Sequence, residues 1–207
     1  MSESIADRRR GTGGGLAVVV CGPSGAGKNS VIDRVMKRLP GLSFSVSYTT
    51  RTRRSGEVDG VDYHYIYSQE FERLVVGGEL VEHVSYLGDQ YGTSRAQIEE
   101  VFARGEDVIL NIDVEGAKTL RQGSLLNCAV AYVFLAPSSL DLLGERLRGR
   151  ATETDEQISA RLEVAKKELE ALSFFDYLVL NDHIESAVDE LYSIIVAERS
   201  RLVKTDD

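Results

Sequence analysis

The sequence predicts an α/β fold in which helices flank a parallel β-sheet. Short apolar runs rich in β-branched residues alternate with helical patterns, and the first run leads through a glycine-rich turn directly into a helix. Strands that alternate with helices form parallel sheets, because each crossover helix packs back onto the sheet. The 207 residues suffice for one well-buried domain with small subdomains, and hardly for two independent domains.

Four short apolar segments are the predicted strands of this sheet. Leu16–Cys21 is rich in β-branched residues and bounded by glycines, as expected for a buried strand. Residues 107–113 and 129–135 have the same character, and Tyr177–Leu180 predicts a last short strand.

The helices are predicted from start and stop signals and from apolar periodicity. Residues 30–39 read as a helix that Pro40-Gly41 ends, and residues 184–199 as the last helix. Ser94 and Thr154 each stand three residues before a glutamine, which is the spacing of a capping box at a helix start. The helix after Thr154 has one apolar face, made of Ile158, Leu162, Ala165, Leu169 and Leu172.

The composition argues against several classes of partner and location. A net charge of −9 disfavours binding to a nucleic-acid backbone or an anionic membrane, and no apolar run approaches the roughly 18 residues of a membrane span. Residues 1–15 carry arginines and glycines without the apolar stretch of a secretory signal, so we expect a disordered tail. Cys21 and Cys128 lie in or beside apolar runs, which predicts buried free thiols and a cytoplasmic location.

A phosphate-binding loop follows the first strand. Residues 22–29 read GPSGAGKN, which matches G-x-x-x-x-G-K with asparagine where serine or threonine usually stands. The glycines let backbone N–H groups converge on phosphate oxygens, and the next helix directs its positive end to the same point. Lys28 adds a full positive charge. The loop predicts a nucleoside triphosphate site, without specifying the reaction.

A second motif, rich in arginine, lies between residues 47 and 63. Residues 47–54 read SYTTRTRR, and residues 56–63 read GEVDGVDY. Arg51 and Arg54 are three residues apart, so both guanidinium groups can face one dianionic phosphate. The hydroxyls of Ser47, Tyr63 and Tyr91 can add neutral donors. The two segments together closely resemble the guanylate kinase signature, S-x-T-T-R-x-x-R and then G-E-x-x-G-x-x-Y, and the resemblance extends over nearly the whole chain.

The resemblance implies a parallel sheet of the P-loop kinase type. It also implies an enzyme that transfers the γ-phosphoryl group of ATP to GMP, with Mg²⁺ as cofactor. It also implies that Glu82, Thr93 and Asp113 contact the guanine ring. Guanine presents donors at N1 and at its 2-amino group, whereas adenine has an acceptor at N1, so a buried carboxylate favours guanine. The implied GMP-binding residues are Ser47, Arg51, Arg54, Tyr63, Glu82, Tyr91, Thr93 and Asp113. The implied ATP-binding residues are Gly22, Pro23, Ser24, Gly25, Ala26, Gly27, Lys28, Asn29, Ser30 and Asn181.

Residues 146–153 are basic and contain a glycine, which predicts a loop. Residues 146–154 resemble the lid of nucleoside monophosphate kinases. By this resemblance Arg146, Arg150 and Arg161 close over the transferring phosphoryl group. With Lys28 and Arg51 they are the predicted catalytic groups, which position and neutralise two polyanions and need no covalent intermediate.

These assignments imply a domain organisation. We expect a single guanylate kinase domain over residues 16–207 after the tail at 1–15. Its core comprises residues 16–46, 94–145 and 155–201, interrupted by a GMP-binding subdomain at 47–93 and the lid at 146–154.

Two asparagines depart from the pattern of the family. Asn29 replaces the usual hydroxyl of the phosphate-binding loop, and Asn111 stands where an acidic residue is usual. Asn29 and Ser30 are the candidate Mg²⁺ ligands, with the nucleotide and water as the other means of holding the metal. These amides leave open a catalytically weak scaffold or sensor on the same fold, and a related kinase with another acceptor remains the second alternative. The oligomeric state is not predicted.

Overall fold

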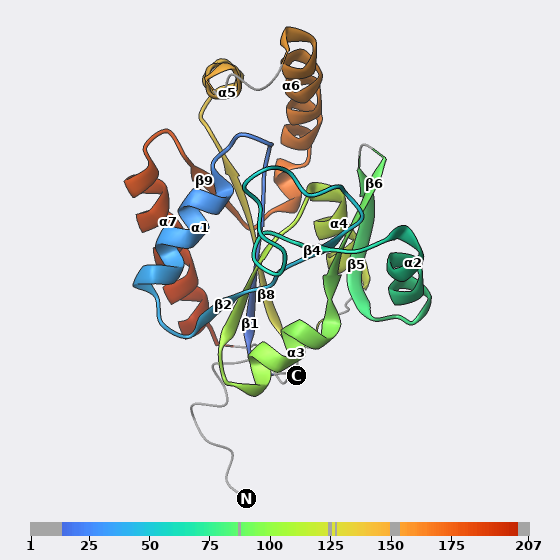
Figure 1. The fold of residues 1–207 in the computed structure, drawn as a ribbon. Coiled ribbons are helices and arrows are strands. Elements are labelled where there is room, and N and C mark those ends of the chain that lie inside the picture. The colour runs from blue at the N-terminus through green and yellow to red at the C-terminus, as the bar shows by residue number, and fades with distance from the viewer. Residues whose placement is uncertain (1–13, 87, 124–125, 127, 150–153, 203–207) are drawn as a thin grey trace, which may run out of the picture.

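The computed structural model describes residues 14–86, 88–123, 126, 128–149 and 154–202 (Figure 1). The predicted disorder of the N-terminal tail concerns mostly residues 1–13, which lie outside the described residues. Within the described part, no helix has both the length and the apolar character needed to cross a membrane.

A five-stranded parallel sheet forms the centre of the molecule, which confirms the predicted fold class. Its strand order is β2-β7-β1-β8-β9, and every neighbouring pair is parallel. The strands are β1 (Leu16–Cys21), β2 (Leu42–Phe44), β7 (Asp107–Asn111), β8 (Ala129–Ala136) and β9 (Tyr177–Leu180). Strand β7 ends two residues before the predicted boundary, because Asp113 already accepts a hydrogen bond from the Gly116 N–H at the start of the next helix.

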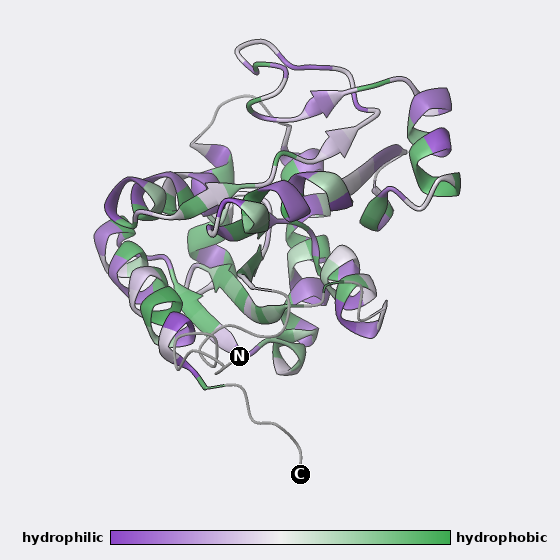
Figure 2. Ribbon diagram, turned by 90° about the horizontal axis from the view of Figure 1, so that it is seen from below, coloured by the Kyte–Doolittle hydropathy of each residue, from purple (hydrophilic) through white to green (hydrophobic). Residues whose placement is uncertain are grey.

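Helices cover both faces of this sheet, as the alternation along β1 requires. Leu16, Val18 and Val20 face α1 (Lys28–Arg38) and α7 (Ile184–Ser200) in one buried cluster. The intervening residues of β1 face α3 (Arg95–Ala103) and α4 (Val114–Gly123) in a second cluster. Figure 1 shows α1 beside α7, and Figure 2 shows hydrophobic residues concentrated in the strands and on parts of the helices. Both cysteines are free; Cys21 is buried and Cys128 is partly buried.

A second, smaller sheet is inserted between β2 and α3. Its order is β4-β3-β6-β5, formed by β3 (Tyr48–Thr49), β4 (His64–Tyr65), β5 (Leu80–Tyr86) and β6 (Asp89–Ser94). Helix α2 (Ser68–Val76) packs on it through a small core of Phe71, Leu74 and Leu80.

Helices α5 (Leu140–Arg148) and α6 (Asp155–Glu170) stand together at one end of the molecule. The capping box of Thr154 is confirmed: Thr154 and Gln157 exchange side-chain to backbone hydrogen bonds of 2.9 and 3.4 Å. At Ser94 only half of the predicted box forms, since the Gln97 side-chain oxygen accepts from the Val46 N–H instead.

The prediction of a loop over residues 146–153 is wrong for residues 146–148. Arg146 to Arg148 form the last turn of α5, and Gly149 caps it. The helix continues because Leu147 extends the apolar face of α5 and is fully buried against α6. The apolar face predicted for α6 is in contact with the core, although Leu172 lies in the short 3₁₀ helix η2 (Leu172–Phe174) that follows.

Candidate active site

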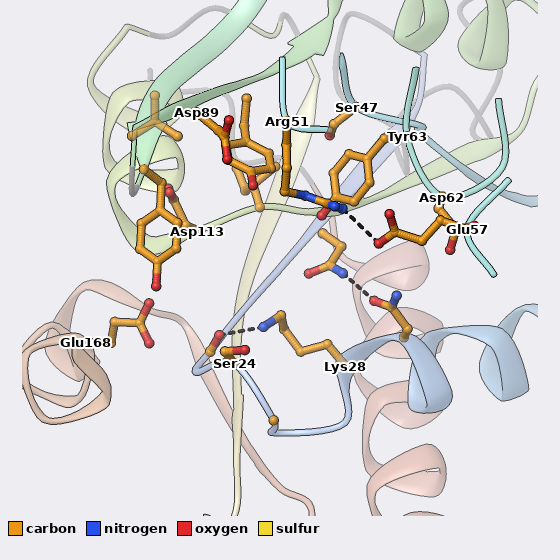
Figure 3. Close-up of a pocket in the computed structure, with 18 of the residues that line it drawn as sticks. Ser24, Lys28, Ser47, Arg51, Glu57, Asp62, Tyr63, Asp89, Asp113 and Glu168 are labelled. Carbon is orange, nitrogen blue, oxygen red and sulfur yellow. Dashed lines mark hydrogen bonds and ion pairs between the residues drawn. The ribbon is translucent and has the colours of Figure 1, made fainter. Parts of the chain in front are cut away.

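A cleft of about 430 Å³ lies between the phosphate-binding loop, the small sheet and α6 (Figure 3). Its position above the carboxyl ends of β1 and β7 is where ligands bind in open α/β sheets. Most of the predicted site residues line it together: Gly22, Ser24, Gly25, Gly27, Lys28, Asn29, Ser30, Ser47, Arg51, Arg54, Tyr63, Glu82, Tyr91, Asp113 and Arg161.

The phosphate-binding loop has the backbone shape that its glycines predict. Gly22, Gly25 and Gly27 all have positive φ angles of 138°, 91° and 88°, which L-residues with a side chain rarely adopt. Lys28 begins α1 and folds back, so that its Nζ donates to the carbonyl oxygens of Gly22 at 2.6 Å and Pro23 at 3.3 Å. The loop therefore holds the Lys28 ammonium group in the lining of the cleft, at the start of α1.

Asn181 supports this loop from beneath and does not line the cleft. It follows β9, is buried, and donates from Nδ2 to the Ala26 carbonyl at 2.7 Å. A Cβ atom at Gly27 would lie 2.5 Å from the same Nδ2, so this approach requires glycine. The predicted ATP-binding residues Pro23 and Ala26 are likewise buried within the loop.

The predicted lid arginines are placed differently from one another. Arg161, on α6, lines the cleft and donates to the Ser24 hydroxyl at 2.5 Å, which joins α6 to the phosphate-binding loop. Arg146 lies outside the cleft lining and donates to the Asp182 carbonyl at 3.1 Å. Arg150 lies outside the described residues.

The basic motif is organised around a carboxylate whose role the sequence reasoning had not assigned. Glu57 accepts from Arg51 at 2.8 Å, from the Arg54 N–H at 2.8 Å and from the Tyr65 hydroxyl at 2.8 Å. Burial alone would raise the pKa of Glu57, but these hydrogen bonds outweigh it and lower the pKa to about 2. Burial lowers the pKa of Arg51, and the partnership with Glu57 reverses this and raises it. Both groups therefore stay ionised and fixed at neutral pH.

Two aromatic rings contact the guanidinium group of Arg51. Its guanidinium lies 5.4 Å from the centre of the Tyr63 ring and 5.8 Å from that of Tyr65. Tyr63 in turn packs edge-on against Tyr91, with ring centres 5.8 Å apart. Stacked in this way, the arginine keeps one orientation, and Tyr63 and Tyr91 face the same cleft as the arginines.

The predicted base-reading carboxylates lie at the other end of the cleft. Glu82 is 3% exposed and accepts from the Thr93 hydroxyl at 2.5 Å, across the β5–β6 pair. Burial raises the pKa of Glu82 to about 7, and the nearby Asp113 adds to the shift. Asp113 accepts from the Gly116 N–H at 2.6 Å, and burial raises its pKa as well. Thr93 is buried behind Glu82 and orients it.

The two asparagines that depart from the family pattern contact each other. Asn111 donates from Nδ2 to the Asn29 side-chain oxygen at 2.6 Å. A carbonyl oxygen has two lone pairs, so the Asn29 oxygen retains one for another donor or a cation. With the Ser30 hydroxyl it offers neutral oxygen ligands of the kind that Mg²⁺ accepts. Within the described residues, no group of three histidine, cysteine or carboxylate side chains could hold a metal ion.

Several cleft residues were missed by the sequence reasoning. They are Asp62, Val84, Tyr86, Asp89, Ile112 and Glu168, together with Glu57. Glu57 stands inside the G-E pair of the signature, so its place in the motif was available as a signal. Glu168 stands three residues after Ala165, beside the apolar face of α6, and a carboxylate in that position also signals a special environment.

Known proteins resemble this chain over most of its length. A sequence model of the family "Guanylate kinase" matches residues 15–198. The chain is 42% identical to the guanylate kinase of Carboxydothermus hydrogenoformans over 189 residues, which cover 89% of each chain. It is 43% identical to that of Symbiobacterium thermophilum over 190 residues, covering 92% of this chain and 89% of the relative.

A solved structure agrees with the sequence relatives. The crystal structure of guanylate kinase from Anaplasma phagocytophilum superposes with a TM-score of 0.74 at 29% identity, and the match covers 90% of this chain and 87% of that one. With the family match over residues 15–198, these similarities show that the chain belongs to the guanylate kinase family.

Proposed function

We propose that this protein transfers the γ-phosphoryl group of ATP to GMP and so forms ADP and GDP. The observation that carries the proposal is that one cleft holds a phosphate-binding loop, an arginine pair and two buried carboxylates. The relatives at 42% and 43% identity are named guanylate kinases, which agrees with this reaction.

The phosphate of GMP fits the arginine end of the cleft. Arg51 and Arg54 supply the charge, and the hydroxyls of Ser47, Tyr63 and Tyr91 supply neutral donors. Glu57 holds Arg51 at 2.8 Å before any substrate is present, so little ordering of this side chain remains for binding. We assign residues 47–93 as the GMP-binding subdomain.

The guanine base fits the carboxylate end of the cleft. Glu82 and Asp113 are acceptors for the N1–H and the 2-amino group, and Thr93 fixes the Glu82 carboxylate. Adenine would place its N1 lone pair against a buried acceptor, which is the situation that polar sites reject most strongly. The Glu82 carboxyl needs to be ionised for this role, and a pKa of about 7 leaves a large ionised fraction at neutral pH.

The transfer step needs positioning and neutralisation of charge. An oxygen of the GMP phosphate attacks the γ-phosphorus of ATP, the bond to the β–γ bridging oxygen breaks, and ADP leaves with that oxygen. Lys28 moves from the loop carbonyls to the ATP phosphates, and Arg161 faces the transferring group from α6. We assign Arg146 and Arg150 to the same lid, over residues 146–154.

Mg²⁺ is the proposed cofactor and accompanies ATP. When bound, it neutralises phosphate charge and orients the phosphate chain. Asn29 and Ser30 would contribute neutral oxygen ligands, so we expect the phosphates and water to hold most of the coordination sphere. The free thiols of Cys21 and Cys128 agree with a cytoplasmic location, where both nucleotides are at hand.

A coupled assay of ADP release tests the proposal. Purified protein receives ATP and Mg²⁺ with GMP or AMP in turn, and we expect rapid turnover with GMP alone. Turnover with AMP in place of GMP would assign the protein to another acceptor. An absence of turnover, with GMP binding still detectable by calorimetry, would favour a scaffold or sensor built on this fold.

A further inference from the structure

The cleft contains a carboxylate for which the reaction outlined above has no use. Glu168 projects from α6 into the cleft lining, and Figure 3 shows it on the side of the cleft that holds Asp113, facing Ser24 and Lys28. Its Oε2 atom is buried and has no hydrogen-bond partner among the described residues. Buried polar atoms nearly always have partners, so this oxygen calls for a ligand that supplies one.

In its ionised form the Glu168 carboxylate can only accept hydrogen bonds. Burial raises its pKa, the charge of Lys28 lowers it, and the charge of Asp113 raises it again. The side chain lies between the base-reading end of the cleft and the phosphate-binding loop (Figure 3). A ligand group at this place must be a hydrogen-bond donor, because a phosphate oxygen would be repelled by the carboxylate.

GMP has few hydrogen-bond donors that could reach Glu168. The N1–H and the 2-amino group of guanine are matched by Glu82 and Asp113, and the phosphate carries no donor in its dianionic form. The remaining donors are the ribose hydroxyls. The ribose connects the base to the phosphate, so it must lie between Asp113 and Arg51, within the cleft that Glu168 also lines.

We propose that Glu168 is a nucleoside-binding residue that accepts a hydrogen bond from a ribose hydroxyl of bound GMP. The inference rests on the proposed function, because it uses the orientation in which guanine faces Glu82. It adds a sugar contact from α6 to the base and phosphate contacts supplied by the small sheet and β7. The helix that carries Arg161 would thereby also sense whether an acceptor nucleoside is bound.

The test compares GMP with 2′-deoxy-GMP and 3′-deoxy-GMP in the wild-type protein and in Glu168→Ala. In the wild type, loss of the contacted hydroxyl should lower kcat/KM about tenfold, as expected for a hydrogen bond to a charged group. In Glu168→Ala the three substrates should agree within about twofold, since the partner is gone. Glu168→Gln retains an acceptor oxygen without the charge and should fall between the two.

Controls separate this contact from a structural role. Glu170→Ala changes an exposed glutamate on the same helix and should leave the discrimination among the three nucleotides unchanged. Glu168→Ala should unfold at the wild-type temperature or above it, because it removes a buried oxygen that has no partner among the described residues of the free protein.

Two results would overturn the inference. The first is a deoxy-substrate penalty that is equally large in the wild type and in Glu168→Ala. The second is a variant that needs more Mg²⁺ for half-maximal activity yet retains the wild-type sugar discrimination, which would assign the carboxylate to the metal. If GMP is not turned over at all, the proposed function fails, and calorimetric binding of GMP and its deoxy analogues still tests the ribose contact.

Discussion

Gly116 illustrates how much of the site depends on single atoms. It lies in the first turn of α4, where a glycine is less favourable than alanine by about 1 kcal/mol. A Cβ atom there would lie 2.5 Å from the Glu82 Oε2 and 3.2 Å from the Asp113 Oδ1. The missing side chain therefore gives both carboxylates their room at the start of α4.

Gly116→Ala is expected to impair recognition of GMP without unfolding the protein. The new methyl group displaces the Glu82 carboxylate, so the KM for GMP should rise about tenfold or more, and selectivity over AMP should fall. The higher helix propensity of alanine should keep the free energy of unfolding near the wild-type value. Steady-state kinetics and urea unfolding measure the two effects.

Gly144→Ala is the matched control for this substitution. Gly144 also lies inside a helix, but its Cβ would meet only the end of the Arg148 side chain at 3.3 Å and Leu162 at 3.5 Å. Equal losses of GMP affinity in both variants would mean that clearance at Glu82 is not the reason for the glycine.

The protonation of Glu82 gives the site a predictable pH dependence. Burial raises its pKa from 4.5 to about 7. The free folded protein then binds this proton more tightly than the unfolded chain. The contribution to stability is thus fully present below about pH 4.5 and is lost as the pH rises to about 7. In the proposed base contact GMP requires the ionised carboxylate, so binding of GMP should strengthen as the pH rises through about 7.

Calorimetry of GMP binding between about pH 5.5 and about pH 8.5 measures this effect. The phosphate of GMP also titrates, with a pKa of about 6, in this range. Glu82→Gln shares the phosphate titration but has no carboxyl, so the difference between the two profiles belongs to Glu82. Parallel profiles would remove Glu82 from base recognition.

At the scale of elements, the phosphate-binding loop is held from two sides before nucleotide arrives. Lys28 donates to two carbonyls of its own loop, and Asn181 donates to Ala26 across 155 residues of sequence. The local signals of this loop were readable in the sequence, because glycines, lysine and helix start follow one another. The support from Asn181 was not readable as such, because no local pattern encodes a contact between the ends of β1 and β9.

Lys28→Ala should abolish turnover and leave GMP binding largely intact. In the proposed function Lys28 serves the ATP phosphates, whereas the GMP phosphate binds at Arg51 and Arg54. The measurement is kcat by the coupled assay beside the Kd of GMP by calorimetry. Lys37→Ala, which changes an exposed lysine in the last turn of the same helix, should retain full activity. Substantial activity of Lys28→Ala would contradict the assigned role.

Other elements show which parts of the fold and of the site can be predicted from the sequence and which cannot. The parallel sheet, most helix starts and the clustering of site residues followed from apolar periodicity, capping signals and motif spacing. The prediction for the end of α5 was wrong. Three basic residues and a glycine are typical of a loop, whereas the burial of Leu147 depends on its contact with α6. The partner of Arg51 and the orphan oxygen of Glu168 depend on tertiary contacts, which a single sequence does not display.

At the scale of the whole molecule, an ion pair joins the C-terminal helix to the central sheet. Asp107, at the start of β7, is 2% exposed and accepts from Arg199 at 2.6 Å and from the Leu16 N–H at 3.1 Å. Arg199 also donates to the carbonyls of Pro40 and Gly41. One network therefore holds β1, β7, α7 and the turn after α1 together, at the end of the sheet opposite the cleft.

Asp107→Ala should lower the free energy of unfolding by about 3 kcal/mol, because it leaves a buried N–H and a guanidinium without their partner. The kcat of the folded protein should not change, since the network is remote from the cleft. Asp189→Ala breaks the exposed pair with Arg38 and should cost less than about 1 kcal/mol. Urea unfolding of both variants measures the difference, and equal effects would contradict the importance of burial.

The small sheet is attached to the rest of the molecule through neighbouring strands. The chain enters it at β3 and leaves it at β6, and these strands pair directly, with Tyr48 opposite Gly92. The two junctions of a segment of more than forty residues thus lie side by side, so the core needs no adjustment to hold an insert of different length. In evolutionary terms the segment that we assign to acceptor binding can be exchanged as one unit, and a P-loop scaffold of this kind can change its acceptor without redesigning its phosphate chemistry.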